Sequence, residues 1–199
     1  MKKIDTLVLA TRNKHKVEEI SAMLAGLSIT VKDLSQFPSC PDVVEDGETL
    51  EENALKKARA AFEHTNLPVI ADDTGLEVYY LLGEPGVYSA RYAGETATYE
   101  DNNRLLLRKL NQVPERRRQA RFRAVIALVG PGFSKTVEGI CEGKILFDNK
   151  GNNGFGYDPI FQPIGHTKTF AEMSADEKNS LSHRSRAIEK LKELLTTLS

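Results

Sequence analysis

Two adjacent carboxylates stand at the end of a short apolar run near the middle of the sequence. Val69, Ile70 and Ala71 are followed directly by Asp72 and Asp73. The run is typical of a buried strand, where a carboxylate is costly unless it meets a cation, a metal ion or several donors, or takes up a proton. Neighbouring strand residues point to opposite faces, so we expect the two carboxylates to have different roles. An alternative without a catalytic role stays open: one carboxylate caps a turn and the other carboxylate pairs with an arginine.

A third carboxylate, Glu45, stands in a glycine-containing turn just before a predicted helix. Thr49, Asn53 and Lys57 recur every four residues along that helix and share one polar stripe, so Lys57 could reach the same ligand as Glu45. Carboxylates from separate loops are hard oxygen donors, which is what Mg²⁺ with a polyphosphate requires. The plainer alternative is that the stripe is the solvated side of the helix.

The segment TRNKHK, from Thr11 to Lys16, lies where a predicted strand passes into a helix. Amides at a helix N-terminus, with a lysine one turn in, form a natural cradle for phosphate. In this reading Asn13 shapes the loop and Lys16 neutralises charge. Taken alone, the segment is equally well explained as a solvated first helical turn with surface lysines.

Two later motifs could recognise a nucleotide base. In GFGYDP, Phe155 could stack on a ring while the glycines let the backbone approach a ligand. In SHR, which ends at Arg184, and at Lys178 upstream, the cationic side chains donate hydrogen bonds and never accept them. Together they would select a ligand edge rich in acceptors. The alternatives are that GFGYDP is an aromatic turn inside a sheet and that SHR is an ordinary tripeptide without a role in binding.

The elements that must position these residues alternate early in the chain and become mostly strands later. Apolar periodicity, capping residues and turn signals define them. We expect a capping box between Thr49 and Glu52, and a turn at Thr74-Gly75 that ends one strand and pairs it with the next. The expected strands are 7–10, 29–31, 68–73, 76–81, 121–129 and 136–146, and the expected helices are 17–24, 49–64, 98–110 and 185–195. This order predicts an α/β fold with a mixed sheet flanked by helices.

Length and composition limit the function classes. The 199 residues, 40% hydrophobic and 28% charged, suit one soluble globular domain over 1–199, and the net charge of −1 makes a long nucleic acid a poor first partner. We predict a cytoplasmic protein, because no signal peptide and no stretch of about 20 apolar residues can be found. Cys40 and Cys141 are expected to be reduced thiols, with zinc or redox chemistry a remote second.

Two tempting patterns are set aside. GPGFSKT, from Gly130 to Thr136, lacks the glycine before lysine that a phosphate-binding P-loop needs. The arginines at 116–118, 121 and 123 could bind RNA, but a solvated loop leading into a strand is the preferred prediction.

Six motifs occur in order along the chain: TRNKHK, VVEDGETLEENALKKA, ADDTGLEV, PGVYSARYAG, GFGYDPIF and EKNSLSHR. Together they resemble the non-canonical purine nucleoside triphosphate pyrophosphatases, the inosine/xanthosine triphosphate pyrophosphatase family, over nearly the whole chain. The resemblance implies a long curved mixed sheet, two lobes around a nucleotide-binding cleft, and usually a homodimer. It also implies Mg²⁺-dependent hydrolysis of a nucleoside triphosphate to the monophosphate and pyrophosphate.

The resemblance also assigns roles to single residues. Glu45 and Asp73 are the implied Mg²⁺ ligands, and Asp73 is also the implied proton acceptor, two roles that compete with each other. Lys57 and Asp72 are the implied supporting residues beside the metal and phosphates, and Thr74 is expected against the substrate. The implied triphosphate loop comprises Thr11, Arg12, Asn13, Lys14, His15 and Lys16, and the implied base-binding set comprises Phe155, Gly156, Tyr157, Asp158, Lys178, His183 and Arg184.

The expected substrates are therefore the triphosphates of inosine, deoxyinosine and xanthosine. Within enzymes, the alternative is a related pyrophosphatase acting on other modified or canonical nucleoside triphosphates. A different class of alternative is a non-catalytic nucleotide-binding or RNA-binding module. The carboxylates argue against this second alternative, because binding alone does not need acids next to a polyphosphate.

Overall fold

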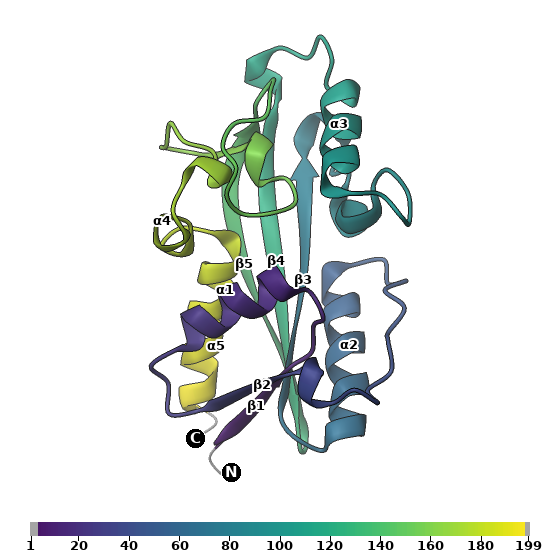
Figure 1. Cartoon of the computed structure of the whole chain (residues 1–199), viewed down its shortest axis with the longest axis vertical. Helices are drawn as coiled ribbons and strands as arrows, with labels where there is room; N and C mark the ends of the chain where they lie inside the picture. The colour runs from purple at the N-terminus through teal and green to yellow at the C-terminus, as the bar shows by residue number, and fades with distance from the viewer. Residues whose placement is uncertain (1–3, 198–199) are drawn as a thin grey trace. The chain divides into compact units, whose positions relative to one another are not determined.

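The computed structural model describes residues 4–197, and within them it has a six-stranded mixed sheet with helices (Figure 1). The strands are β1 (Thr6–Leu9), β2 (Thr30–Asp33), β3 (Val69–Val78), β4 (Gln119–Gly130), β5 (Phe133–Ile145) and β6 (Phe161–Pro163). The α-helices are α1 (Lys14–Leu24), α2 (Leu50–Thr65), α3 (Tyr99–Lys109), α4 (Ala175–Asn179) and α5 (His183–Thr197). The strand order is β2-β1-β3-β4-β5-β6, with β1 parallel to β2 and β3, and β5 antiparallel to β6. The predicted mixed α/β sheet is confirmed.

The chain divides into two compact units. Unit 1 takes its described residues from Met1–Asp73, Ala124–Gly139 and Arg184–Ser199, and unit 2 comprises Thr74–Arg123 and Ile140–His183. Strands β3, β4 and β5 have residues in both units. The single domain over 1–199 and the cleft between two lobes stay predictions.

In unit 1, β1, the start of β3 and the end of β4 are buried on both faces. Leu7, Leu9 and Ile126 share one core with the apolar residues of α1 and α5. Val8 and Val125, which alternate with them and so point to the opposite face, are buried as well. Figure 1 shows α2 on the other side of the strands from α5. Strands covered on both faces read as continuous apolar runs, which explains why β1 and the start of β3 lack an alternating pattern.

Unit 2 has its own core, formed where β3 and β4 meet α3 and the segment around β6. Leu76 and Val78 of β3 pack in one cluster with Leu106 of α3 and with Leu110, which caps the end of that helix. An aromatic group lies within this cluster, where the Phe122 and Phe161 ring centroids are 4.6 Å apart in an edge-on arrangement.

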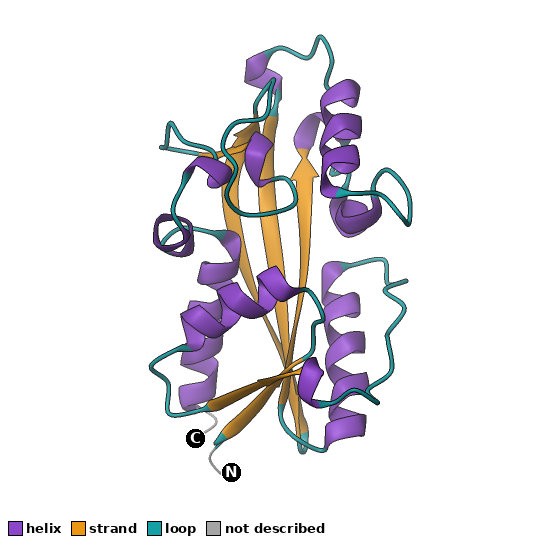
Figure 2. Ribbon diagram, in the orientation of Figure 1, coloured by secondary structure: helices purple, strands orange, loops and turns teal. Residues whose placement is uncertain are grey.

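The predicted turn at Thr74-Gly75 is wrong. Strand β3 continues without a break from Val69 to Val78, as Figure 2 shows, and the chain reverses at Leu82 and Gly83 instead. Both of these residues have positive φ angles, of 55° and 96°. Burial on each side of the Thr-Gly pair outweighs its local turn preference, because a reversal there would expose the apolar residues that follow.

Two smaller predictions also need correction. The Thr49 hydroxyl caps α2 by accepting from the Glu52 amide, but the Glu52 carboxylate accepts from the Glu48 amide, so the reciprocal half of the capping box is absent. Arg118 is not in a solvated loop: it is 2% exposed. Its guanidinium donates to the carbonyl oxygens of Leu110, Ile145 and Leu146.

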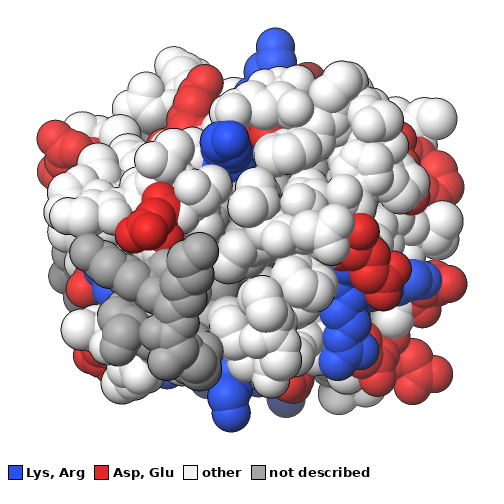
Figure 3. All heavy atoms as spheres, turned by 90° about the horizontal axis from the view of Figure 1, so that it is seen from below, with Lys and Arg blue, Asp and Glu red and all other residues white. Residues whose placement is uncertain are grey.

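Arg121 and Arg123 also have a protein partner, since both donate to Glu77, at 2.7 and 2.8 Å. On the face drawn in Figure 3, Lys and Arg side chains lie among Asp and Glu side chains rather than in one continuous basic area. Within residues 4–197, no helix is both long enough and apolar enough to cross a membrane. Cys40 and Cys141 are both buried, and neither forms a disulfide.

Candidate active site

The site in unit 1 begins where β1 ends and β3 continues. The Ala10 amide donates to the Ile70 carbonyl at 2.8 Å, and the parallel register between the two strands ends at Ile70. Two residues further along β3, the Asp72 carbonyl points to the same side. It accepts from Lys57 Nζ at 2.9 Å and lies 3.4 Å from Lys16 Nζ. The carboxylates therefore lie beside the carboxyl end of β1, in the middle of β3 rather than at its end.

Asp72 shares a face of β3 with Ile70 and points toward α1 and α5. Its Oδ2 atom is 2.8 Å from Lys16 Nζ and accepts from Arg184 Nη2 at 3.2 Å. Arg184 Nη1 donates to Glu19 at 2.5 Å, so α1, β3 and α5 are joined by alternating charges. Burial alone would raise the pKa of the Asp72 carboxyl, but Arg184 and Lys16 outweigh it and hold the pKa far below its ordinary value.

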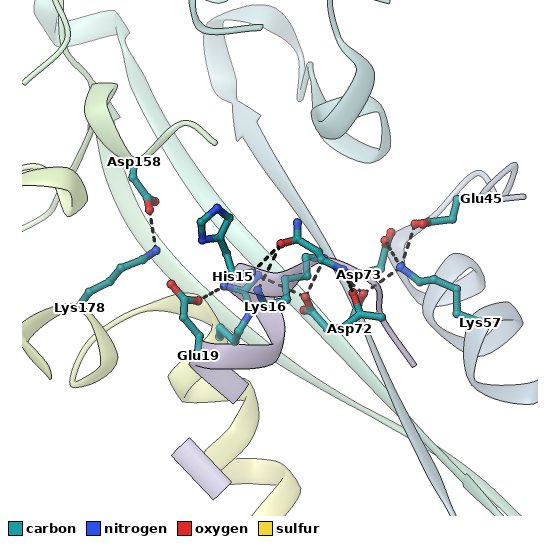
Figure 4. Close-up of polar contacts among 12 residues, drawn as sticks. His15, Lys16, Glu19, Glu45, Lys57, Asp72, Asp73, Asp158 and Lys178 are labelled. Carbon is teal, nitrogen blue, oxygen red and sulfur yellow. Dashed lines mark hydrogen bonds and ion pairs between the residues drawn. The ribbon is translucent and has the colours of Figure 1, made fainter. Parts of the chain in front are cut away.

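Asp73 points to the opposite face of β3, toward α2. Figure 4 shows Lys57 between Asp73 and Glu45, with Nζ donating to both carboxylates at 2.8 Å. Burial raises the pKa of Asp73 to about 6, against the pull of Lys57, and the hydrogen bond that a protonated Asp73 donates to the Glu45 carboxylate adds to the rise. Burial also acts to raise the pKa of Glu45, but Asp73 and Lys57 bring it below its ordinary value. The two carboxyl groups thus share protons and a cation, and the prediction that Asp72 and Asp73 face different ways is confirmed.

The loop from Thr11 to Lys16 is held by its own side chains. Asn13 caps α1, with Oδ1 accepting from the amides of His15 and Lys16 at 3.1 and 3.3 Å, which confirms that Asn13 shapes the loop. The Thr11 hydroxyl accepts from the Asn13 amide at 3.2 Å. Arg12 turns to the following loop, where it donates to Asp42 and to the Cys40 carbonyl, each at 2.7 Å. Lys14 and His15 are exposed.

The donors of this cluster fit a hard divalent cation. Glu45 and Asp73 present carboxylate oxygens to one point, which Lys57 Nζ occupies at 2.8 Å from each. In the described part of the chain, no group of three or more His, Cys, Asp or Glu side chains lies together as a complete metal cage. Mg²⁺ is commonly bound by one or two carboxylates together with substrate phosphates and water. Two carboxylates are therefore a sufficient protein contribution for that ion.

Most of the predicted base-binding residues lie in unit 2, whereas Arg184 lies in unit 1. The Asp158 carboxylate accepts from the Phe155 amide at 2.9 Å and from Lys178 Nζ at 2.6 Å, and Figure 4 shows this second contact. Lys178 Nζ also lies 4.8 Å from the centre of the Phe155 ring. Gly154 has a φ of 71°, and a Cβ there would lie 2.1 Å from Asp158. The glycine-rich turn is thus closed around a buried ion pair.

Three further members of this set lie in the same unit. Tyr157 is buried and its hydroxyl donates to the Ser89 carbonyl at 2.9 Å. The His183 ring stacks on Phe122, with centroids 4.6 Å apart. The Gly156 carbonyl accepts from Asn103 at 3.0 Å, and the glycine itself has a φ of 63°.

The structure places the predicted residues in two groups. Unit 1 holds Thr11–Lys16, Glu45, Lys57, Asp72, Asp73 and Arg184, and unit 2 holds Thr74, Phe155–Asp158, Lys178 and His183. Their roles in metal binding, catalysis and base recognition stay predictions. Sequence reasoning missed Glu19, which pairs with Arg184. Its spacing of three residues from Lys16 on α1 was the available signal, but such a pair is usually only a surface contact.

Comparison with known proteins gives a consistent result. The Ham1 family model matches residues 7–194. A dITP/XTP pyrophosphatase from Geobacter sulfurreducens is 52% identical over 190 residues, which cover 95% of this chain and 96% of that protein. One from Desulforamulus reducens is 50% identical over 193 residues, which cover 96% of each chain.

Solved structures agree. The Staphylococcus aureus Ham1 protein superposes with a TM-score of 0.87 at 41% identity, covering 98% of this chain and 100% of that one. A Ham1 protein from Coxiella burnetii gives 0.88 at 41% identity, covering 96% and 98%. The resemblance found in the motifs is thereby confirmed, and the chain belongs to the Ham1 family.

Proposed function

We propose that this protein hydrolyses non-canonical purine nucleoside triphosphates, namely ITP, dITP and XTP, to the monophosphate and pyrophosphate. The observation that carries the proposal is the arrangement at the end of β1, where Lys57 bridges Glu45 and Asp73 beside the helix N-terminus that carries Lys16. The similar proteins from Geobacter sulfurreducens and Desulforamulus reducens bear the name dITP/XTP pyrophosphatase, which supports the same reaction.

Charge balance supports a requirement for a divalent cation, which we propose is Mg²⁺. Four carboxylates face three cations in the unit 1 cluster, so it has one more negative than positive charge: the residues are Glu19, Glu45, Asp72, Asp73, Lys16, Lys57 and Arg184. A polyanionic triphosphate would meet net repulsion there. Glu45 and Asp73 would hold Mg²⁺, which would supply positive charge against the phosphates and lower the pKa of bound water.

The charged residues of the site have different proposed roles. Lys16 and Lys57 offset charge on the phosphate oxygens, mainly by position and electrostatics. We assign proton acceptance to Asp73 from the family resemblance, and in the metal-free protein burial raises the pKa of this carboxyl to about 6. Asp72 is fixed in its ionised form by Arg184 and Lys16, so it holds the lysine rather than moving a proton.

Base selection is proposed to rest on donors facing the 6-position of the purine. Inosine and xanthosine present a 6-oxo acceptor there, whereas adenosine presents an amino donor. Lys178 can donate to the former and would face the latter donor to donor, while Phe155 stacks on the ring; the family resemblance gives Arg184 the same role. A site that leaves its polar groups unpaired rejects an analogue by about 10⁴-fold or more, so ATP is expected to be a poor substrate.

The finer properties implied by the family resemblance belong to the same proposal. We propose that the protein acts as a homodimer in the cytoplasm. The mass in solution by light scattering tests the dimer, and a monomer at micromolar concentration would contradict it.

The decisive experiment measures pyrophosphate release from ITP, XTP, dITP, GTP and ATP at one Mg²⁺ concentration and again with excess EDTA. The proposal expects Mg²⁺-dependent turnover of the first three and little of ATP, with loss of turnover in a folded Asp73→Asn variant. Preferred turnover of a canonical or modified pyrimidine triphosphate would favour the alternative, a related pyrophosphatase that acts on other nucleoside triphosphates. Nucleotide binding without pyrophosphate release would favour a non-catalytic module.

A further inference from the structure

The loop that carries Glu45 has little regular structure of its own. Residues 37–49 contain no strand or helix, so no backbone ladder fixes where Glu45 points. Glu45 is nevertheless held with its carboxylate 2.8 Å from Lys57 Nζ, on the helix that follows the loop. Metal sites need their ligands placed within a fraction of an ångström, so something must hold the backbone of this loop as well.

Asn53, in the first turns of α2, holds that backbone. Its Oδ1 atom accepts from the Gly47 amide at 2.8 Å, two residues after Glu45. Asn53 is 1% exposed, and the fit is tight: a Cβ on Gly47 would lie 2.7 Å from Asn53 Oδ1 and 2.9 Å from Glu52 Cβ. Asn53 and Lys57 are one turn apart on the same helix face, so α2 holds the loop backbone with one residue and the ligand side chain with the other.

The nitrogen end of the Asn53 side-chain amide does not add to the stability of the fold. Its Nδ2 atom is buried and has no hydrogen-bond partner among residues 4–197. Leaving a buried donor unpaired carries a desolvation penalty that offsets the gain from an ordinary hydrogen bond. An apolar side chain of similar size would therefore serve the core at least as well.

We propose that Asn53 is a positioning residue that sets the place of the metal ligand Glu45 through the Gly47 amide. The proposal rests on the function proposed above, because it needs Glu45 to bind the metal. Residues that orient metal ligands typically change metal affinity by 10–100-fold when mutated. Asn53 is thus expected to matter for metal affinity more than for folding.

The test measures the Kd for Mn²⁺ by electron paramagnetic resonance, with and without a non-hydrolysable α,β-methylene analogue of ITP. Asn53→Leu is expected to raise that Kd by about 10-fold or more while keeping or raising Tm. Gly47→Ala, which crowds the same contact from the loop side, is expected to weaken Mn²⁺ binding in the same direction. If Asn53→Leu fails to fold, Gly47→Ala still tests the proposal.

Asn102 provides a matched control. It is 2% exposed and also tethers a loop amide, with Oδ1 accepting from the Ala93 amide at 2.8 Å. Its Nδ2 donates to the Ala90 carbonyl at 3.1 Å, so both ends of this amide are satisfied. Asn102→Leu is therefore expected to lower Tm and leave the Kd for Mn²⁺ unchanged, the opposite pattern to Asn53→Leu.

A double-mutant cycle separates positioning from a general effect. If Asn53 acts through Glu45, adding Asn53→Leu to Glu45→Gln should weaken Mn²⁺ binding much less than Asn53→Leu does alone. Additive losses, or a folded Asn53→Leu protein with a Kd within twofold of the wild type, would overturn the proposal. Wild-type protein that binds Mn²⁺ but releases no pyrophosphate from ITP would instead refute the proposed function and leave this inference standing. Wild-type protein that binds no Mn²⁺ even with the analogue would overturn both.

Discussion

Replacing Asp73 by Asn should stabilise the metal-free protein while removing its activity. The pKa of Asp73 is raised from its ordinary 3.8 to about 6, mainly by burial. Each tenfold change in proton affinity is worth about 1.4 kcal/mol, so keeping this carboxyl ionised at pH 7.5 opposes folding by about 3 kcal/mol. Asn keeps the shape and an oxygen for Lys57 but carries no charge. In a chain of this size we expect Tm to rise by roughly 5–10 °C.

The sign of the pH dependence follows from the same shift. Because the folded-state pKa of Asp73 lies above its unfolded value, the wild type loses stability as pH rises from about 4 to about 6. The amide that replaces this carboxyl in the variant does not titrate, so the advantage of the variant should grow across this window. We expect the advantage at pH 5 to be roughly half of that at pH 7.5, with no further change above that.

Thermal unfolding of both proteins in excess EDTA at pH 5 and pH 7.5 is the assay. Asp72→Asn is the matched control on the neighbouring residue, and its effect should have the opposite sign. Asp72 is held ionised by buried Arg184, and breaking such a pair costs about 3–5 kcal/mol. A lower Tm for Asp73→Asn than for wild type, or an advantage equal at the two pH values, would refute the reasoning about Asp73.

Three further substitutions test the rest of the site. Glu45→Gln should raise the Mg²⁺ concentration needed for half-maximal activity, because one anionic ligand becomes a neutral amide; an unchanged Mg²⁺ titration would make Glu45 a turn residue. Lys16→Ala should raise KM for every triphosphate by a similar factor, since it acts on phosphate charge, and a changed ITP-to-ATP ratio would place Lys16 elsewhere. Arg184→Ala should lower Tm, because Glu19 and Asp72 lose their buried partner, and should narrow the ratio of ITP to ATP turnover. An equal loss of kcat/KM for both nucleotides would leave Arg184 with the structural role alone.

Several features of the fold follow from local sequence signals that the structure does not override. The stop of α1 at Leu24 depends on a glycine and on apolar spacing within a few residues of it. The opposite orientation of Asp72 and Asp73 follows from the two-residue repeat of any strand. These predictions needed no knowledge of distant contacts.

What the sequence could not predict depends on distant partners. Thr74-Gly75 has the composition of a turn, and only burial of the following residues in unit 2 shows that β3 continues through it. Arg118 lies in a run of arginines that reads as solvated, yet its partners are carbonyls up to 28 residues away. Glu19 is paired with a residue 165 positions later, which no local pattern can reveal.

The unequal lengths of β1 and β3 have a consequence for how the site can change over generations of mutation. Beyond the end of β1, the lysines are met by the main-chain oxygen of Asp72, which exists whatever side chain occupies that position. A single-codon substitution can alter the charge of the site but cannot delete this acceptor. Only an insertion or deletion that lengthens β1 would place another peptide group there. The contact between the lysines and this main-chain oxygen therefore depends on the architecture of the sheet. A substitution of the Asp72 side chain leaves that acceptor in place, even where it changes the carboxylate.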